Sequence, residues 1–510
     1  MSNGPPRTET RPKVARDLLL VAGLLVGLAV TIVMTLTETL EFGSSSGGFV
    51  YGYLKPFRST SVLAFMAIAP LALLTVHLAS RNLQRHEVPA VAACFVMGST
   101  AQLLLRRLTP FSMSRITRHG EFYGTARRYG AGRFLRDYVE LAPGLPTHPR
   151  ANMPGKVLLF DALLPLSTSP VVLSVLLALL SSLGGIGVYV LSRSLFRSRR
   201  VALYAMVLYL FLPARLYFLP LLNTVTPLLA LALVIVLVWY LEIRRRSALV
   251  LLGGLLYLTA FFEPTPLVLF ALFAAVALVV GVRRELPLRD AAALVVLPIL
   301  VFLLVHACMV WATGFDLFAA LAHTRDDATA FNRGSGRPYF DFLVPNVREF
   351  LVNSGTLTSL LAIGCLPLAV RRLRTAVLER QGAVLDPLAV VALAAFATLL
   401  VLSLSGISRG EVSRLWIFVS AFVAIAAARV CAALPGPGLF YGVLAATILQ
   451  VSLTIGPVGF AIQGLYCPGC EGVPQNSLGP TFDVVFVGAA ALVCLGVRRG
   501  RRSGELRLDP

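Results

Sequence analysis

Charged side chains are scarce in this sequence. Of its 510 residues, 14% are Asp, Glu, Lys or Arg, whereas 57% are hydrophobic. Soluble globular domains carry about 25% charged residues, so the composition excludes an ordinary soluble protein. No polar segment is long enough to form a soluble domain of its own. The chain also shows neither a repeat of fixed period nor the paired, Gly/Pro-broken helices of inverted-repeat transporters.

The sequence instead contains many long apolar runs. They recur from Leu18 to Val497, and a helix of about 20 apolar residues crosses the ~30 Å hydrocarbon core of a bilayer. The sequence therefore predicts an all-α polytopic membrane protein with about 14 transmembrane helices. The first run, 18–36, is long for a signal peptide and lacks a clean small-residue cleavage site after it, so we expect a retained helix.

Acidic residues are also few, because 25 Asp and Glu face 45 Lys and Arg, and the formal net charge is +20. A basic chain can bind nucleic acid, but here clusters of arginine directly flank the apolar runs, which is typical of topology signals. We therefore expect no nucleic-acid partner. The clusters assigned to the cytoplasm are 81–85, 193–200, 244–246, 283–284, 371–372 and 498–499.

This assignment places both termini inside the cell. The predicted organisation is a membrane domain over 17–498 in the plasma (inner) membrane, with cytoplasmic tails at 1–16 and 499–510. Two long loops, 106–166 and 314–354, then lie on the outer side. Any extracytoplasmic chemistry has to use these loops and the shorter ones beside them.

Paired cysteines are nearly absent. Five of the seven cysteines are isolated within apolar runs, where cysteine packs as a small core residue. Cys467 and Cys470 form one C-x-x-C in an outer loop, and either a local disulfide or two free thiols fits this spacing. Because no second pair and no nearby histidine accompanies them, the sequence predicts no zinc site.

The first long outer loop is strongly cationic. Between Arg106 and Lys156 it contains ten Arg and Lys residues and three Asp and Glu residues, on the side that the positive-inside bias disfavours. One interpretation is a solvated face in contact with lipid headgroups. The other is a phosphate site, because a planar guanidinium donates two parallel hydrogen bonds to phosphoryl oxygens. Positions 134, 135, 138 and 139 share an apolar stripe, which predicts a short helix in the interface plane.

The same loop carries a family resemblance. The run GEFYGTARRYGAGRFLRDYVEL, followed by THPRANMPGKVLL, resembles the first large outer loop of GT-C fold glycosyltransferases, membrane enzymes that use polyprenyl-phosphate sugars. In the branch with protein mannosyltransferases and the lipid A aminoarabinose transferase, an acidic pair precedes an alanine-containing helix, a glycine turn and a Pro-Pro element. Here Gly120 and Glu121 stand at the acidic pair, Ala126 on the helix, Gly132 at the turn and 153–155 at the Pro-Pro element.

The resemblance implies a divergent bacterial member with a GT-C-like helix bundle and short interfacial helices in its outer loops. Because Gly120 lacks the usual first acid, Glu121 becomes the first candidate for the general base and Asp137 the second. Arg128 is a candidate for binding phosphate. The residues expected to shape the site beside them are His148, Asn152 and Lys156.

The second long outer loop combines carboxylates with aromatic residues. His323, Asp326 and Asp327 precede an aromatic segment that begins at Tyr339. Sugar sites use both residue types, and on this ground Tyr339 is a candidate for binding substrate. A solvated loop with aromatics at the membrane interface fits equally well. Two adjacent carboxylates can hold a divalent ion, but alone they are a weak metal signal, so no metal ligands are assigned.

A shorter outer segment, SGISRGEVSRLW at 405–416, places three charged residues close to membrane depth. Charges there are costly and usually face a cavity or pair with one another. We expect Arg409 or Arg414 to neutralise a donor phosphate and Glu411 to orient one of them. Similar Gly-Glu-x-x-Arg turns occur in bacterial GT-C-like membrane proteins. A purely local pair is the alternative, since Glu411 and Arg414 are three residues apart.

These features together predict a membrane glycosyltransferase with its active site on the outer side. It would move a sugar from a polyprenyl-phosphate donor to a cell-envelope glycan, lipid or protein, with a carboxylate as general base and arginines stabilising the leaving phosphate. Two alternatives stay open. One is a transporter or flippase of a lipid-linked anionic substrate, and the other, suggested by Gly120, is a catalytically inactive relative of the GT-C enzymes.

Overall fold

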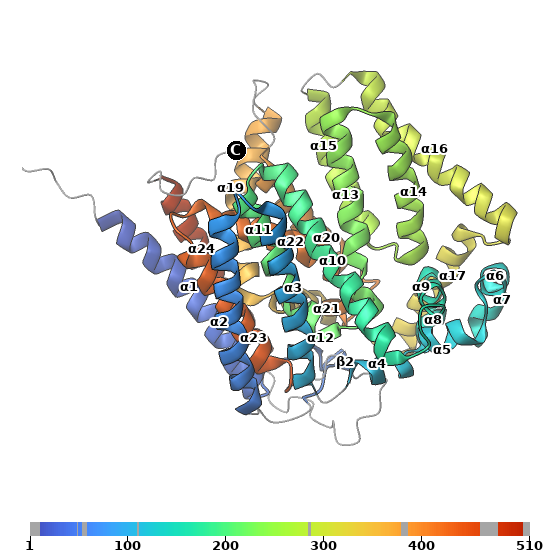
Figure 1. The fold of residues 1–510 in the computed structure, drawn as a ribbon, viewed down its shortest axis with the longest axis horizontal. Helices are drawn as coiled ribbons and strands as arrows, with labels where there is room; N and C mark the ends of the chain where they lie inside the picture. Colours follow the sequence, from blue (N-terminus) through green and yellow to red (C-terminus); the bar gives the residue numbers. More distant parts are fainter. Residues whose placement is uncertain are drawn as a thin grey trace, which may run out of the picture.

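The computed structural model describes an almost entirely helical chain, whose sole strand pair within the described residues is the hairpin of β1 (Gly43–Ser44) and β2 (Phe49–Val50). Figure 1 shows long helices side by side, with short helices gathered toward one end of the bundle. The residues that the structure describes are 11–47, 49–53, 59–109, 112–283, 287–378, 386–458 and 478–502.

Nine helices of the described residues are long and apolar enough to cross a membrane, which confirms a polytopic all-α membrane protein. They are α1 (Arg11–Leu36), α2 (Ser59–Asn82), α3 (Glu87–Leu105), α10 (Pro170–Phe196), α13 (Thr226–Ile243), α16 (Leu288–Thr313), α19 (Thr356–Leu378), α20 (Pro387–Ser405) and α24 (Gly479–Arg502). Further apolar helices are α14 (Arg246–Phe262), α15 (Pro266–Arg283), α22 (Ile417–Ala433) and α23 (Gly438–Thr454), whose apolar stretches are shorter. A total of about 14 crossings stays a prediction.

The first and last helices form an antiparallel pair. Gly23 of α1 lies against Ala489 of α24, and Gly496 lies against Leu20, so closely that a Cβ at either glycine would meet backbone atoms at 2.7–3.0 Å. Small residues permit this close packing where lipid provides no hydrophobic driving force between helices. The start of α1 and the end of α24 consequently lie at the same end of the pair (Figure 1).

The centre and the periphery of the bundle differ in exposure. Helix α22 and the short α11 (Arg199–Leu210) are buried along almost their whole length. Helix α16 has most of its apolar side chains outside, including Leu304 at 63% and Trp311 at 90% exposure. An apolar helix exposed in this way suits a lipid environment.

The predicted outer loop 106–166 is a chain of short helices. Phe134, Leu135 and Tyr138 of the predicted stripe are buried, but Val139 is exposed. The stripe is divided because the backbone leaves helical geometry at Asp137, which separates α6 from α7. The elements are η1 (Arg106–Leu108), α4 (Met113–His119), α5 (Glu121–Arg128), α6 (Ala131–Arg136), α7 (Tyr138–Leu141), η2 (Ala142–Gly144), α8 (Thr147–Arg150) and α9 (Gly155–Leu163).

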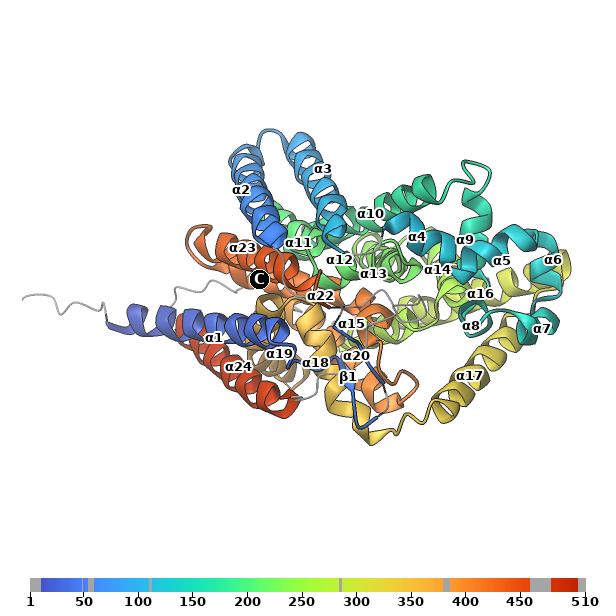
Figure 2. The same cartoon turned by 90° about the horizontal axis from the view of Figure 1, so that it is seen from below.

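The segment 314–354 is also mostly helical rather than an irregular loop. Asp316 caps α17 (Leu317–Gly334) by accepting hydrogen bonds from the backbone amides of Phe318 and Ala319. After η4 (Phe340–Phe342), α18 (Leu343–Asn353) carries buried polar residues. Figure 2 shows α17 crossing from the α6–α7 region toward α18.

The segment 405–416 turns sharply between α20 and α22. Gly406 and Gly410 have positive φ angles, and Glu411 adopts the left-handed region at φ 60°, which directs the chain into the single turn α21 (Val412–Leu415). Trp416 is fully buried beside Phe350. The remaining elements are α12 (Pro213–Phe218) and η3 (Leu222–Thr224). Both cysteines of the C-x-x-C lie outside the described residues, so their pairing stays a prediction.

Candidate functional site

Glu121 and His148 form the first part of the candidate site. Glu121 opens α5, where the helix dipole favours a carboxylate. Its Oε2 atom accepts hydrogen bonds from the backbone amide of His148 and from Nδ1 of the same residue, which lies 3.0 Å away. The hydrogen bond from His148 holds the pKa of Glu121 below its usual range. The carboxyl group is therefore ionised at neutral pH and oriented from α8.

A chain of polar contacts connects His148 to the helix bundle. The Asn152 amide donates to the carbonyl oxygen of His148 at 2.9 Å, and Lys156 donates to the amide oxygen of Asn152 at 2.6 Å. Lys156 is 1% exposed and also pairs with Glu263, at the end of α14. A buried ammonium is stable only with such partners. Lys156 thus acts as a buried support beneath the site.

Glu411 lies between two arginines on the other side of the site. It contacts Arg414 three residues later and Arg337, whose Nη2 atom is 3.4 Å from Oε1. Burial alone raises the pKa of Glu411, but Arg414 and Arg337 outweigh it and the pKa is lowered. Arg337 is also held by the carbonyl oxygen of Arg409 and lies over the ring of Phe49. Sequence analysis missed Arg337 because its partners come from distant segments.

Arg409 is half-buried and has no carboxylate partner among the described residues. Its Nε atom donates to the carbonyl oxygen of Gly406 at 3.0 Å, and Nη1 donates to that of Arg337. Tyr339 lies beside it, with the guanidinium 5.9 Å from the ring centroid, and donates its hydroxyl hydrogen to Leu404. Tyr339 therefore supports Arg409 through its ring, while its hydroxyl group is engaged by the protein.

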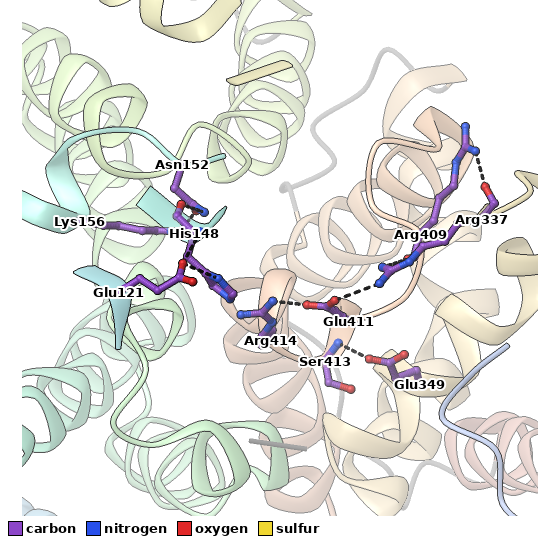
Figure 3. A network of polar contacts seen from close by, with 10 residues as sticks. All are labelled: Glu121, His148, Asn152, Lys156, Arg337, Glu349, Arg409, Glu411, Ser413 and Arg414. Atoms are coloured by element: carbon purple, nitrogen blue, oxygen red, sulfur yellow. Dashed lines mark hydrogen bonds and ion pairs between the residues drawn. The ribbon is translucent and has the colours of Figure 1, made fainter. Parts of the chain in front are cut away.

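The two parts of the site face each other. His148 is among the charges that lower the pKa of Glu411, although the two residues come from segments far apart in the sequence. Figure 3 shows the His148 ring on the side of Glu121 that faces Arg414, with Glu411 and Arg337 beyond. The structure thus brings together predicted site residues from the segments 106–166 and 405–416.

Two predicted site residues are not part of this network. Arg128 is exposed on the last turn of α5, and its contact is with the ring of Tyr129 at 5.3 Å. Asp137 lies 3.8 Å from Arg133, a side chain that is 71% exposed. The structure gives neither residue a contact with Glu121, His148 or Arg414.

A further buried carboxyl group was not predicted from the sequence. Glu349 of α18 is fully buried, and its Oε1 atom accepts a hydrogen bond from the backbone amide of Ser413 at 2.8 Å. Its Oε2 atom has no partner among the described residues. Burial raises the pKa of Glu349 to about 7. A lone glutamate within an amphipathic stretch carries no local signal for this environment, although strongly perturbed carboxyls gather at functional sites.

No cluster of three or more His, Cys, Asp or Glu side chains suited to a metal ion occurs in the described part of the chain. The adjacent acids of α17 have separate arginine partners. Asp326 pairs with Arg325 at 3.0 Å, and Asp327 pairs with Arg150 at 2.9 Å. The two carboxylates accordingly do not share a ligand position.

Comparison of the sequence with models of known protein families gives no match. Comparison with curated proteins also gives no match.

Proposed function

We propose that the protein is a GT-C-like membrane glycosyltransferase that moves a sugar from a polyprenyl-phosphate donor to a hydroxyl group of a cell-envelope acceptor. The observation that carries the proposal is the convergence of the Glu121–His148 pair with Arg337, Glu411 and Arg414 (Figure 3). A carboxylate that is ionised and oriented faces an arginine-rich cluster. The active site lies on the outer side of the membrane.

The proposed chemistry is a displacement at the anomeric carbon. Glu121 accepts the proton of the acceptor hydroxyl group while that oxygen forms a bond to the anomeric carbon. The bond from this carbon to the phosphate oxygen breaks, and its electron pair leaves with the phosphate. Arg414 and Arg409 stabilise the negative charge of the leaving group, since arginine offers several fixed donors to phosphoryl oxygens.

The charge balance favours an anionic ligand. Arg337 and Arg414 share one carboxylate, Glu411, and Arg409 contacts only carbonyl oxygens among the described residues. A phosphate group can bind to this excess of cationic donors without removing Glu411, which holds two of the arginines in place. Lys156 is engaged by Glu263 and contributes to the shape of the site.

The glycine at position 120 is compatible with activity. A Cβ atom there would lie 3.2 Å from the carbonyl oxygens of both Ile116 and Thr117. A side chain at this position requires these neighbours to shift by a few tenths of an ångström, so the glycine fits closely here. Glu121 then serves as the single carboxylate at this end of α5.

The position of charge also favours a transferase over a carrier. In the nine candidate spans of the described residues, the Asp, Glu, Lys and Arg side chains lie near an end of the span. Carriers of charged substrates place such groups near the middle of the membrane. In this chain the polar network occupies the short elements between spans.

The test is transfer of radiolabelled sugar from polyprenyl-phosphate donors to envelope material, with membranes that contain matched amounts of each variant. Glu121→Gln should lower transfer by about 100-fold or more, because general-base catalysis contributes roughly 10²–10⁴-fold. Asp137→Asn is the matched control and should keep nearly normal transfer. Equal activity of Glu121→Gln and the wild type would exclude Glu121 as the base, and absence of transfer by the wild type with every donor would overturn the proposal.

A further inference from the structure

Helix α17 presents two polar side chains to the short helices of the first outer segment. His323 and Asp327 are four residues apart and therefore lie on one face of α17. The His323 ring meets the Tyr138 ring edge-on, with centroids 6.5 Å apart. Asp327 reaches α8, where Arg150 Nε lies 2.9 Å from its Oδ1 atom.

This face of α17 carries two polar atoms that are buried and make no hydrogen bond to the described residues. The Oδ2 atom of Asp327 and the Nε2 atom of His323 are both buried, and neither has a hydrogen-bond partner within the part of the chain that the structure describes. A buried polar atom without a partner is costly, and native structures rarely keep such atoms without a reason. Two of them on one helix face leave hydrogen-bonding capacity that a polar ligand can take up.

Arg150 and Tyr138 link the same residues to the segment that holds the proposed base. Arg150 follows His148 by two residues on α8, and its charge is among those that lower the pKa of Glu121. Tyr138, beside His323, donates its hydroxyl hydrogen to the carbonyl oxygen of Asn152 at 2.7 Å. A ligand bound at Asp327 and His323 is thereby near Arg150 and the segment of α8 that holds Glu121.

We propose that Asp327 and His323 form the subsite for the acceptor, and that the acceptor is a carbohydrate. The carboxylate oxygen accepts hydrogen bonds from hydroxyl groups, and the imidazole nitrogen donates or accepts one. A phosphate or carboxylate ligand is disfavoured because Asp327 would repel it. The role of this ligand as acceptor rests on the proposed transferase function, whereas the binding of a neutral sugar at Asp327 and His323 does not depend on it.

The test is binding of neutral methyl glycosides (methyl α-D-mannopyranoside, α-D-galactopyranoside and α-D-glucopyranoside) to the purified full chain in nanodiscs, measured by saturation-transfer NMR without a donor. Asp327→Asn should weaken binding about tenfold, the effect of losing one hydrogen bond to a charged group. Asp326→Asn is the matched control, because Asp326 is the adjacent residue, is 69% exposed and pairs with Arg325. Its affinity should equal that of the wild type.

A second variant distinguishes a loss of binding from a loss of folding. His323→Phe keeps an aromatic ring against Tyr138 and leaves the Arg150–Asp327 pair intact, but it removes the nitrogen atom, so it should also weaken glycoside binding at an unchanged melting temperature. If no glycoside binds the wild type, or if Asp326→Asn weakens binding as much as Asp327→Asn, the subsite is wrong. Glycoside binding that depends on Asp327, together with no transfer from any donor, would uphold the subsite and reject the transferase.

Discussion

The Nδ1 atom of His148 lies 3.0 Å from the Oε2 atom of Glu121, although 27 residues separate them in the chain. The backbone amide of His148 donates to the same oxygen. Two donors from one residue therefore set both the charge and the direction of the carboxylate. We regard His148 as a positioning residue, because its contacts act on the proposed base.

Removal of His148 should change the pH dependence of transfer. The pKa of Glu121 is lowered mainly by the His148 hydrogen bond, and a general base acts only when it is ionised. His148→Ala should raise this pKa toward the ordinary range of a carboxyl group, so the acid limb of the pH–rate profile should move to higher pH. The measurement is transfer rate between pH 4 and pH 8.

The matched control for this experiment is His119→Ala, in the same segment. His119 is exposed on the last turn of α4, and its loss should leave the acid limb where it is in the wild type. An unchanged profile in His148→Ala would contradict the role of His148, whatever the effect on the maximal rate.

Arg414 should determine donor affinity. Its guanidinium contacts Glu411 and faces His148 (Figure 3), and a lysine cannot reproduce the fork that binds two phosphoryl oxygens. Arg414→Lys should weaken binding of polyprenyl phosphate by about tenfold, since each 1.4 kcal/mol is a factor of ten. Binding is measured by titration of the lipid into protein in nanodiscs. Arg133→Ala, an exposed arginine of the same outer region, should bind as the wild type does, and equal affinities of all three proteins would reject the assignment.

The Lys156–Glu263 pair should behave as one structural unit. Lys156 is 1% exposed, and Glu263 belongs to a segment 107 residues away. Lys156→Met or Glu263→Gln alone should lower the free energy of unfolding by about 3–5 kcal/mol, because each leaves a buried charge without its partner. The double variant should lose less than the sum of the two. Additive losses in detergent unfolding experiments would show that the pair is not coupled.

Glu349 should make stability depend on pH. Its pKa in the folded protein is raised to about 7, so the folded state holds a proton that the unfolded state has released. The resulting stability is complete below the unfolded pKa and is lost as pH rises through about 7. The loss amounts to roughly 3 kcal/mol for a shift of this size. The melting temperature of the wild type should therefore fall between pH 5 and pH 8.

Glu349→Gln removes the titrating group and should flatten this dependence. The control is Glu140→Gln, an exposed residue of α7, which should melt with the same pH dependence as the wild type. If the melting curves of Glu349→Gln and the wild type respond to pH in parallel, the buried carboxyl is not the cause.

The sequence by itself determined the class of this protein and the chemistry available to it. Apolar runs of membrane-spanning length are a local property, so the polytopic helical class follows from them directly. Glu411 and Arg414 were also identifiable as candidates, because isolated charges between apolar runs are costly and stand out, whereas Glu121 and His148 were proposed from the family resemblance of the first outer loop. Their identification needed no knowledge of which segments meet.

Tertiary structure decided which of these residues act together. Contacts between segments far apart in the chain place His148 opposite Glu411 and bury Lys156 against Glu263. The same packing leaves Asp137 outside this network. The helical character of 314–354 and the burial of Glu349 were likewise hidden, because packing overrides the local pattern of charge. Composition and periodicity describe what each segment can bury, and only the packed bundle determines against which partner it is buried.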